Sequence, residues 1–517
     1  MQSDLNFLRQ DMEINIILQL LAILTFCFFV WQLVKQPLER PSLRSVAILV
    51  LGDIGRSPRM MYHAESFAEN NFETYLIGND GSKPVPSLLS IPHVHFLYLP
   101  NAPSTSGLPF ILSAPRKIVH QVFSILNALL FRIPRPPEFI VVQNPPSIPT
   151  LALVWLVGEL RGSKVIIDWH NLGYSILALK LGDTHPFVKL AKWFEAYFGR
   201  CAYAHLFVTN AMRDFLVREW HLQGHKVVLH DRPPAYFHRT SPSEMHELFL
   251  HLQPSFSAPS LQNFLPAANP PFSTPFTQTS SPHHSKHTPP STLELEGEYD
   301  FSPMPHQRLD RPALLISSTS WTPDEDFSIL LEALKLYEQK ARDASTTGGG
   351  LPKVLMVVTG KGPERDKYMS EVAVLQKEWQ WVRCVSMWLE PEDYPLLLGS
   401  ADLGISLHSS SSALDLPMKV VDMFGCGLPV CALDFACLHE LVQDGVNGLV
   451  FHNAQELATQ LASLLASFPT SPTLASLRQS LEASGKGAGN WEWGSWSENW
   501  NRVMRPLVLR DVPLENT

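Results

Sequence analysis

Short runs of apolar, mostly β-branched residues alternate with longer amphipathic stretches from Ser45 onward. Runs with almost no polar interruption are typical of strands in a parallel sheet whose two faces are covered by helices. The pattern stops near residue 238 and resumes near residue 310, which predicts two α/β halves. The predicted strands are Val46–Leu51, Phe139–Asn144, Lys164–Asn171, His205–Asn210 and Lys226–His230, followed by Ala313–Ser318, Lys353–Gly360, Ala401–His408 and Leu428–Leu433.

A different pattern precedes the first half. Residues Ile14 to Val34 carry no charge, and a helix of that length spans about 30 Å, the thickness of the hydrocarbon core of a bilayer. The run is long for a signal peptide, and no small-x-small cleavage site follows it. Lys35, Arg40 and Arg44 follow it with one acidic residue among them, so the positive-inside rule places the rest of the chain in the cytosol. We therefore predict a single-pass anchor within residues 1–44.

The stretch between the two halves, residues 239–309, has no strand or helix periodicity. It holds 12 of the 43 prolines, together with many Ser, Thr and His residues. Because few of its side chains could fill a core, we expect a disordered insertion.

Two further apolar stretches need a place in the fold. Phe110 to Phe131 is strongly apolar but is interrupted by Arg116 and Lys117, so it is either a helix lying on a membrane surface or a core helix of the first half.

Four tryptophans stand between positions 491 and 500, and such large side chains need burial. We expect residues 491–517 to pack back across both halves.

Composition and charge narrow the functional classes. The chain has 517 residues, of which 45% are hydrophobic, enough for more than one core. A net charge of −9 argues against nucleic acid as the main partner. The six cysteines are scattered without metal-ligand spacing, so we expect reduced thiols rather than a disulfide framework.

The first strand is followed by the turn Gly52 to Arg59, which contains two glycines. Ser57 can cap a helix whose first residue is Pro58. The free N–H groups at such a helix start attract anions, and Arg56 and Arg59 would strengthen this attraction. A plain turn with a helix cap is the alternative. The glycine spacing is not that of a dinucleotide-binding loop, so no nicotinamide cofactor is indicated.

Asp168, Trp169, His170 and Asn171 end another predicted strand. The carboxyl ends of parallel strands line the ligand crevice of such sheets. A histidine there can serve as a general base because its ordinary pKa lies near neutrality. His170 is therefore a candidate base, although a lone histidine is more often structural.

Leu407 to Val430 is the segment densest in candidate residues. Its run of four serines includes Ser409 and Ser410, which supply hydroxyl donors. Asp415 can cap a helix that begins near Pro417. A capped helix with solvated charges is the alternative to a binding site.

Two lysines near predicted turns suit a diphosphate. Lys419 and Asp422 are three apart in the predicted helix and share a face. Lys419 at a helix start suits a diphosphate, while the carboxylate of Asp422 suits the two hydroxyls of a ribose. Gly360 and Lys361 follow another strand and could also approach phosphates.

These motifs together resemble one family. The stretches LGDIGRSPRM, DWHNLGYS, LISSTSWTPDEDF, VTGKGP and LDLPMKVVDMFGCGLPV are similar to those of the chitobiosyldiphosphodolichol β-mannosyltransferases. The resemblance covers nearly the whole chain except residues 239–309. It implies an α/β fold of the GT-B type, with two Rossmann-like domains facing a cleft and one N-terminal transmembrane helix.

The resemblance also implies roles for the predicted regions. These are a lumenal tail and transmembrane anchor (1–44), an acceptor domain (45–238), the disordered insertion (239–309), a nucleotide-sugar domain (310–490) and the Trp-rich segment (491–517). It further implies the endoplasmic reticulum membrane as the location, with the catalytic part in the cytosol. The implied partners are that membrane, the dolichol-linked chitobiosyl diphosphate, and other mannosyltransferases of the same pathway.

Carried onto this sequence, the family's motifs imply the donor site. Pro417-x-Lys419-x-x-Asp422 is similar to a Pro-x-Lys-x-x-Glu pattern in which the acid holds the ribose and the lysine lies near the diphosphate. Asp replaces Glu here, which leaves the ribose geometry less defined. Gly360 and Lys361 fall in the glycine-rich phosphate loop.

The same resemblance places Gly55, Arg56 and Ser57 in the loop that faces the acceptor. It implies transfer of mannose from GDP-mannose with inversion, so one base must take the proton of the acceptor hydroxyl. His170 and Asp53 are the two candidate bases, and the sequence does not choose between them.

No cofactor is implied beyond the donor itself. The triple Asp324 to Asp326 looks like a metal-binding DxD motif, but GT-B enzymes usually work without one, so we expect no essential metal. Two other functions compete with the mannosyltransferase. They are a related GT-B enzyme with another nucleotide sugar, and an inactive scaffold subunit that retains the fold.

Overall fold

The computed structural model describes residues 44–101, 110–279, 304–322, 325–346, 350–409, 412–485 and 495–509, together with residue 19. The described residues form two compact units. The first comprises the chain up to Leu229 and the segment from Val503, and the second runs from His230 to Arg502. The predicted anchor, Ile14 to Val34, lies outside the described residues apart from residue 19. Among the helices that are described, none is long and apolar enough to cross a membrane.

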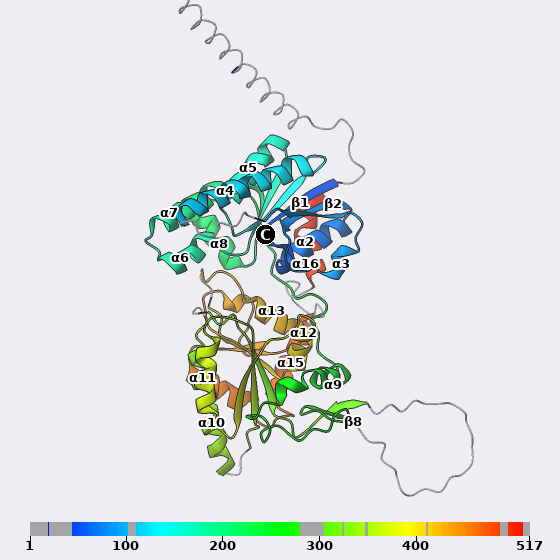
Figure 1. Cartoon of the computed structure of the whole chain (residues 1–517), viewed down its shortest axis with the longest axis vertical. Helices are drawn as coiled ribbons and strands as arrows, with labels where there is room; N and C mark the ends of the chain where they lie inside the picture. Colours follow the sequence, from blue (N-terminus) through cyan, green and yellow to red (C-terminus); the bar gives the residue numbers. More distant parts are fainter. Residues whose placement is uncertain are drawn as a thin grey trace, which may run out of the picture. The chain divides into compact units, whose positions relative to one another are not determined.

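The first unit is built on a parallel sheet in the order β3-β2-β1-β4-β5-β6-β7 (Figure 1). Its central strand β1 is apolar throughout its middle, and Val46 to Leu49 are fully buried. The order reverses between β1 and β4, and such a reversal opens a crevice at the carboxyl ends of the strands. The strands are β1 (Arg44–Asp53), β2 (Phe72–Asn79), β3 (Val94–Leu99), β4 (Phe139–Asn144), β5 (Lys164–Trp169), β6 (Cys201–Phe207) and β7 (Gln223–Val228).

Helices connect these strands and pack on the sheet. The hydroxyl of Tyr203 in β6 donates to the carbonyl of Leu507 at 2.8 Å, which ties the last described helix to this unit. The helical elements are η1 (Ile54–Arg56), α2 (Pro58–Glu69), α3 (Pro86–Leu89), α4 (Phe110–Asn127), η2 (Ala128–Arg132), α5 (Thr150–Arg161), α6 (Gly173–Leu181), α7 (Pro186–Phe198), α8 (Asn210–Trp220) and α17 (Arg505–Leu509).

The second unit repeats this architecture with the strand order β12-β11-β10-β13-β14-β15, again with a reversal beside its central strand β10. A small antiparallel pair, β8 with β9, belongs to the same unit. The strands are β8 (Thr277–Thr279), β9 (Pro305–Gln307), β10 (Ala313–Ser318), β11 (Val354–Thr359), β12 (Val382–Met387), β13 (Leu403–Ser406), β14 (Val430–Leu433) and β15 (Gly448–Phe451).

The longest helix of this unit is α10, which packs against α14. Its inner face buries Leu330, Leu334 and Tyr337 in the core. The helical elements are α9 (Pro242–His251), η3 (Gln253–Phe256), α10 (Phe327–Thr346), α11 (Arg365–Leu375), α12 (Asp393–Ser400), α13 (Met418–Gly425), η4 (Leu438–Glu440), α14 (Ala454–Leu464), α15 (Pro472–Gly485) and α16 (Trp496–Val503).

The predicted disordered insertion is wrong for residues 239–279. Ser241 and Glu244 form a capping box that starts α9. Phe249, Phe256 and Phe276 are buried together, with the rings of Phe249 and Phe276 stacked 4.2 Å apart. The sequence did not predict this cluster, because its aromatic residues are spaced irregularly within a segment rich in proline and serine. Residues 280–303, the remainder of the insertion, lie outside the described residues.

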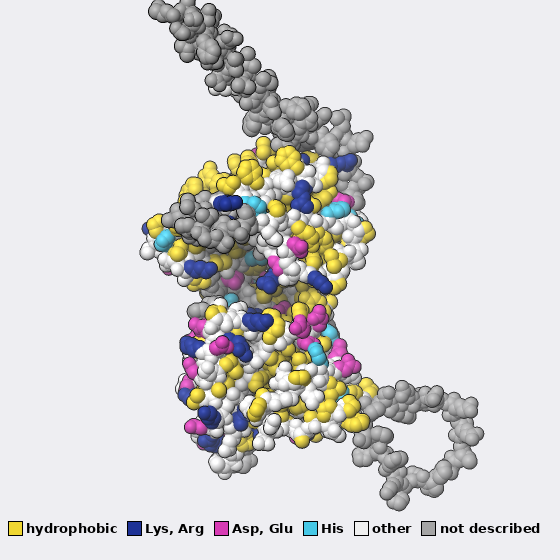
Figure 2. Space-filling view, viewed as in Figure 1, with side chains coloured by type: hydrophobic (Ala, Val, Ile, Leu, Met, Phe, Trp, Pro, Cys, Tyr) yellow, Lys and Arg dark blue, Asp and Glu magenta, His cyan; other side chains and the backbone are white. Residues whose placement is uncertain are grey.

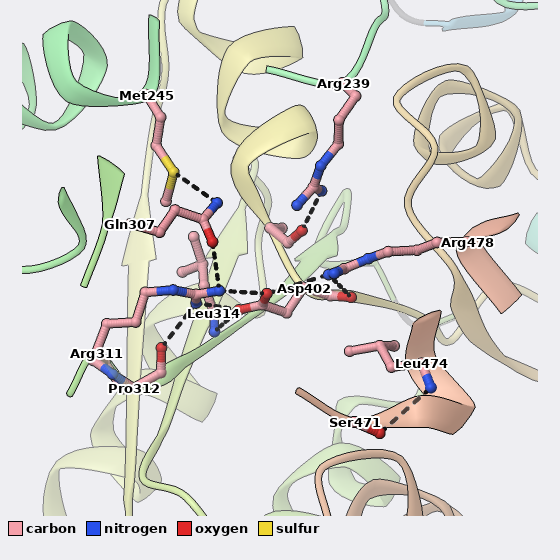
Figure 3. Close-up of polar contacts among 11 residues, drawn as sticks. Arg239, Met245, Gln307, Arg311, Pro312, Leu314, Asp402, Ser471, Leu474 and Arg478 are labelled. Carbon is pink, nitrogen blue, oxygen red and sulfur yellow. Dashed lines mark hydrogen bonds and ion pairs between the residues drawn. The ribbon is translucent and has the colours of Figure 1, made fainter. Parts of the chain in front are cut away.

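A buried ionic network fastens the start of this segment to the sheet (Figure 3). Asp402, just before β13, accepts hydrogen bonds from Arg311 at 2.6 and 2.9 Å and from Arg478 at 3.2 Å. Arg239 donates to the carbonyl of Ala401 at 2.7 Å. Residue 239, the predicted domain boundary, is therefore half-buried and bonded to the second unit.

Candidate functional site

The predicted acceptor turn lies at the end of β1, beside the reversal in strand order. The carboxylate of Asp53 accepts hydrogen bonds from the N–H of Gly55 at 3.0 Å and from the hydroxyl of Ser82 at 2.8 Å. It also accepts from the N–H of Ser82. A Cβ atom on Gly55 would stand 2.3 Å from the Ser82 carbonyl oxygen, so the close approach requires glycine. Asp53 therefore fixes the turn.

These bonds also weaken Asp53 as a base. Burial raises the pKa of Asp53, but the hydrogen bonds from Ser82 and Gly55 and the nearby Arg56 together bring the pKa below its ordinary value. The guanidinium of Arg56 lies 3.5 Å from this carboxylate and is 81% exposed, so it remains open to an anion.

The helix start predicted at Pro58 is confirmed, but the predicted cap is wrong. The hydroxyl of Ser57 donates to the carbonyl oxygen of Asp53 at 3.2 Å, and no side chain caps α2. The η1 turn between Asp53 and Ser57 brings that carbonyl within hydrogen-bond distance of the hydroxyl.

A buried cluster of charges lies at the carboxyl end of β5. Asp168 accepts two hydrogen bonds from Arg59, at 2.8 and 3.0 Å. Nε2 of His63 lies 3.2 Å from the same carboxylate, and Nε2 of His170 lies 3.0 Å from it. Arg59 also donates to the carbonyl of Leu229 at 2.8 Å. The predicted anion-binding role of Arg59 is therefore wrong, because its guanidinium is buried and paired inside the first unit.

The cluster orients His170. Burial raises the pKa of Asp168, but Arg59 and then His170 and His63 hold it well below its ordinary value, so this residue is a carboxylate. A carboxylate only accepts hydrogen bonds, so Nε2 of His170 carries the proton and Nδ1 has the free lone pair. The imidazole is 22% exposed, and its backbone N–H donates to the carbonyl of Asn144 at 2.9 Å.

A second buried carboxylate holds the chain just after His170. Glu195 of α7 accepts hydrogen bonds from the N–H groups of Gly173 at 2.9 Å and Tyr174 at 3.1 Å. The amide of Asn144 donates to it at 2.6 Å. Burial raises the pKa of Glu195 above its ordinary value despite these bonds. This side chain links the end of β4, the His170 segment and α7.

In the second unit, the predicted phosphate loop approaches the end of β10 closely. Gly360 has a φ of +122°, and a Cβ on it would stand 1.8 Å from the Thr319 carbonyl oxygen. The same clash would arise between Gly362 and Ser320. Lys361 between them is exposed, and its ammonium lies 3.9 Å from the centre of the Trp388 ring. Glycine is needed here because two loops meet backbone to backbone.

Lys419 lies in the first turn of α13 and is held by a glutamate. Its ammonium lies 2.5 Å from Oε1 of Glu325, which is almost fully buried. The other oxygen of Glu325 accepts from the Thr319 hydroxyl and from the N–H of Ser320 at 2.8 Å. A backbone bridge between Glu325 and His408 joins this loop to the segment after β13. Glu325 therefore forms an ion pair with Lys419. Asp324, the first residue of the DxD-like triple, lies outside the described residues. The expectation of no essential metal stays a prediction.

Asp422 lies one turn further along α13 and has a different environment from Lys419. Burial and then the nearby carboxylate of Asp231 raise the pKa of Asp422 to about 8. The segment after Asp231 packs on this helix, because a Cβ on Gly425 would stand 2.6 Å from Pro233. Because two nearby carboxylates repel each other when both are ionised, such a pair tends to hold a proton or to accept hydrogen bonds from hydroxyl groups.

The remaining donor candidates lie on the loop before α13. Asp415 does not cap the helix; Pro417 stands at the cap position without a side-chain bond. The Asp415 carboxylate instead accepts from Ser412 at 3.3 Å. Ser409 is exposed, and Ser410 lies outside the described residues.

Sequence reasoning missed several partnerships that the structure brings into these clusters, and it gave Arg59 a different role. Asp168 stood two residues before His170 at a strand end, a spacing that could have been recognised. The partners Arg59, Glu195 and Asp231 lie far along the chain, and no local signal marks them.

Comparison with known proteins agrees with this geometry. The pattern of the family described as "Glycosyl transferase 4-like domain" matches residues 55–231, and that described as "Glycosyl transferases group 1" matches residues 311–467. Among solved structures, Anabaena HepE in complex with UDP and glucose has a TM-score of 0.55 at 15% identity, covering 91% of this chain and 100% of that one. Two parallel sheets, each with a reversal, and these matches define a glycosyltransferase of the GT-B fold.

Curated relatives narrow the family. The chain is 45% identical over 467 residues to the chitobiosyldiphosphodolichol β-mannosyltransferase of Mus musculus, covering 90% of this chain and 89% of that protein. It is 44% identical to the Homo sapiens protein of the same name, over 90% and 93% of the two chains. The Arabidopsis thaliana relative, named UDP-glycosyltransferase TURAN, is 38% identical over 90% and 97%. The chain belongs to the chitobiosyldiphosphodolichol β-mannosyltransferase family.

Proposed function

We propose that this enzyme transfers mannose from GDP-mannose to the outer N-acetylglucosamine of a dolichol-linked chitobiosyl diphosphate, forming a β-1,4 linkage. The observation that supports the substrates is the 44–45% identity, along 90% of the chain, to relatives named for this reaction. An α-linked donor and a β-linked product require one displacement. The acceptor oxygen forms a bond to C1 of mannose as the bond from C1 to GDP breaks.

His170 is the base that takes the proton of the acceptor hydroxyl in this proposal. Its Nε2 donates to Asp168, which Arg59 keeps ionised, and its Nδ1 is the nitrogen that accepts the proton. The carboxylate then stabilises the imidazolium that forms. Asp53 is the weaker candidate, because both of its oxygens already accept hydrogen bonds from the turn.

The second unit binds the donor in this proposal. Lys419 and Lys361 lie close to the diphosphate and stabilise the charge that develops as GDP leaves. Glu325 holds the Lys419 ammonium at the start of α13. Asp422 accepts the hydroxyl groups of the ribose, and its protonated form can also donate.

The setting is the cytosolic face of the endoplasmic reticulum membrane, with residues 14–34 as the single anchor. This part of the proposal rests on the uncharged run and on the basic residues that follow it. Other mannosyltransferases of the same pathway are proposed as partners, since they act on the product.

A transfer assay tests the proposal and its main rival. The name of the Arabidopsis relative raises a UDP-sugar as the alternative donor. Purified full-length protein is given GDP-mannose, UDP-glucose or UDP-N-acetylglucosamine with a chitobiosyl diphosphate lipid, and the linkage of the product is determined. We expect a β-1,4-mannoside from GDP-mannose alone. Transfer from a UDP-sugar, or an α-linked product, would refute it.

A further inference from the structure

The helical hairpin of α6 and α7 leaves a stripe of large apolar side chains uncovered. Val188 and Ala191 of α7 are buried against the first unit. On its outer side, Phe187, Leu190, Trp193 and Tyr197 follow one another every three or four residues and are 54–64% exposed. That spacing places them along one face of the helix.

The uncovered surface continues onto the neighbouring helices. Leu179 of α6 is 63% exposed, and Trp155 of α5 is 45% exposed. Helix α7 packs against both α6 and α5, so these side chains adjoin the stripe. Figure 2 shows hydrophobic side chains gathered along the edge of the first unit over α4 and α5. A patch of this kind usually marks a surface that binds something.

The charges beside the stripe indicate what binds. Lys180, Lys189 and Lys192 are exposed on the hairpin, with the Lys192 ammonium 5.2 Å from the centre of the Tyr174 ring on the α6 side. Asp183 is the exposed acidic residue between Gly173 and Phe198. Flexible lysine side chains beside Trp and Tyr suit a bilayer interface, where the rings enter the headgroup layer and the ammonium groups meet lipid phosphates. A protein partner would more often call for a charge-depleted core.

We propose that the outer face of the α6–α7 hairpin inserts its apolar stripe into the headgroup layer of an anionic membrane. The hairpin lies against the lipid surface, separately from any anchor near the start of the chain. The stripe supplies the apolar contact, and the three lysines supply the attraction to anionic lipid. The surface differs from Phe110–Phe131, the stretch for which the sequence left a membrane-surface helix and a core helix as alternatives.

The hairpin is joined directly to the candidate base. Helix α6 begins three residues after His170, and Glu195 of α7 accepts hydrogen bonds from the N–H groups of Gly173 and Tyr174. Membrane contact by the hairpin would therefore hold the His170 segment next to the surface from which a lipid-linked acceptor extends. This link rests on the proposed function, whereas the membrane contact itself does not.

A fluorescent label tests the contact without any activity. Full-length protein with Leu190→Cys carries a polarity-sensitive dye and is reconstituted into vesicles. Its background has Cys201→Ser, which removes the thiol that is exposed among the described cysteines, and Cys27→Ser, which removes the cysteine near the start of the chain. The vesicles contain phosphatidylcholine alone or with phosphatidylserine, and brominated lipids serve as quenchers. Val374→Cys on α11, at a side chain that is 63% exposed in the second unit, is the matched control.

We expect a blue shift and bromolipid quenching at position 190, stronger with phosphatidylserine, and neither at position 374. In the double variant Lys189→Gln with Lys192→Gln, the fraction of dye quenched by bromolipid should fall about fivefold for each lysine removed. A dye at position 190 that stays in water in both vesicle types overturns the proposal. So does a dye that is shielded in lipid-free protein, because self-association or a protein contact would then cover the stripe.

The link to the acceptor has a separate readout. Trp193→Glu should raise KM for the vesicle-bound chitobiosyl lipid about tenfold or more, because burial of one large apolar side chain is lost. The KM for a short-chain, water-soluble acceptor should not change. Equal losses with both acceptors would overturn the link, while absence of any transfer by wild-type protein would refute the proposed function and leave the dye result standing.

Discussion

At the scale of single residues, the charge state of Asp168 decides which group can act as the base. The carboxylate is buried, but Arg59 pairs with it through two hydrogen bonds. Without that guanidinium, burial would favour the protonated acid, which would not fix the proton on Nε2 of His170. The structure thus favours His170 over Asp53, a choice that the sequence left open.

His170→Ala should lower kcat by about 10²- to 10⁴-fold while GDP-mannose affinity stays near normal, because proton transfer is lost but donor binding is not. Steady-state kinetics and nucleotide titration measure both. His225→Ala, at an exposed histidine of the same unit, is the control.

Asp53→Asn is the competing variant. It weakens the hydrogen bonds that fix the β1 turn, so we expect a lower Tm and weaker acceptor binding rather than loss of a titrating group. If Asp53→Asn abolishes kcat in a stable protein while His170→Ala does not, the base is Asp53.

Asp422 should make stability depend on pH. Its pKa of about 8 lies above the ordinary value, so between about pH 4 and 8 the folded chain binds a proton that the unfolded chain lacks. The free energy of unfolding therefore falls as pH rises through this window. Asp422→Asn cannot ionise and should raise Tm by about 3 °C or more at pH 8.5, with a smaller gain at pH 5.

The same change should weaken GDP binding if Asp422 accepts the ribose hydroxyls. Thermal unfolding at the two pH values and GDP titration measure the two effects. Asp434→Asn, at an exposed carboxylate of the same unit, controls for charge alone. A Tm gain that is equal at pH 5 and pH 8.5 would show that the Asp422 carboxyl does not titrate in this window.

At the scale of elements, the segment after Arg239 is a folded part of the second unit. The capping box of α9, the buried phenylalanines and the β8–β9 pair all lie within it. Thr279 and Pro305 stand opposite each other in that pair, so a short loop can join the two strands.

Replacing residues 281–303 with a linker of about four residues should leave Tm and transferase activity nearly unchanged. Removing residues 239–309 should prevent folding of the second unit, because it takes away Arg239 and the core around Phe249 and Phe276. Circular dichroism and thermal unfolding distinguish the two deletions. Equal stability of the two deletion variants would mean that residues 239–309 do not contribute to the core of the second unit.

At the scale of the whole molecule, the chain leaves the first unit at Leu229 and returns to it at Val503. The contact of Tyr203 with Leu507 fastens the returning segment. The prediction that residues 491–517 pack across both halves stays a prediction, since residues 491–494 and 510–517 lie outside the described residues.

The membrane topology is also a property of the whole chain. With the basic residues after position 34 on the cytosolic side, protease added to sealed microsomes should digest the chain beyond Ser45. Immunoblotting with an antibody to the second unit measures this, and a lumenal marker protein confirms that the vesicles are sealed. Protection of that region until detergent is added would reverse the proposed orientation.

The sequence by itself determined the two α/β halves, most of their strands and the helix start at Pro58. These features follow from local patterns, since an uninterrupted apolar run and a proline at a helix start can both be recognised from adjacent residues. The family could also be recognised from long motifs, because each motif is a continuous stretch of sequence that forms one turn of the site.

Only the tertiary structure decided the state of the site residues. Asp168 meets Arg59 across 109 positions, and Lys419 meets Glu325 across 94. The order of strands in each sheet brings these partners together, and no periodicity in the sequence records that order. The raised pKa of Asp422 likewise depends on burial and on Asp231, both of which exist only once the second unit has folded.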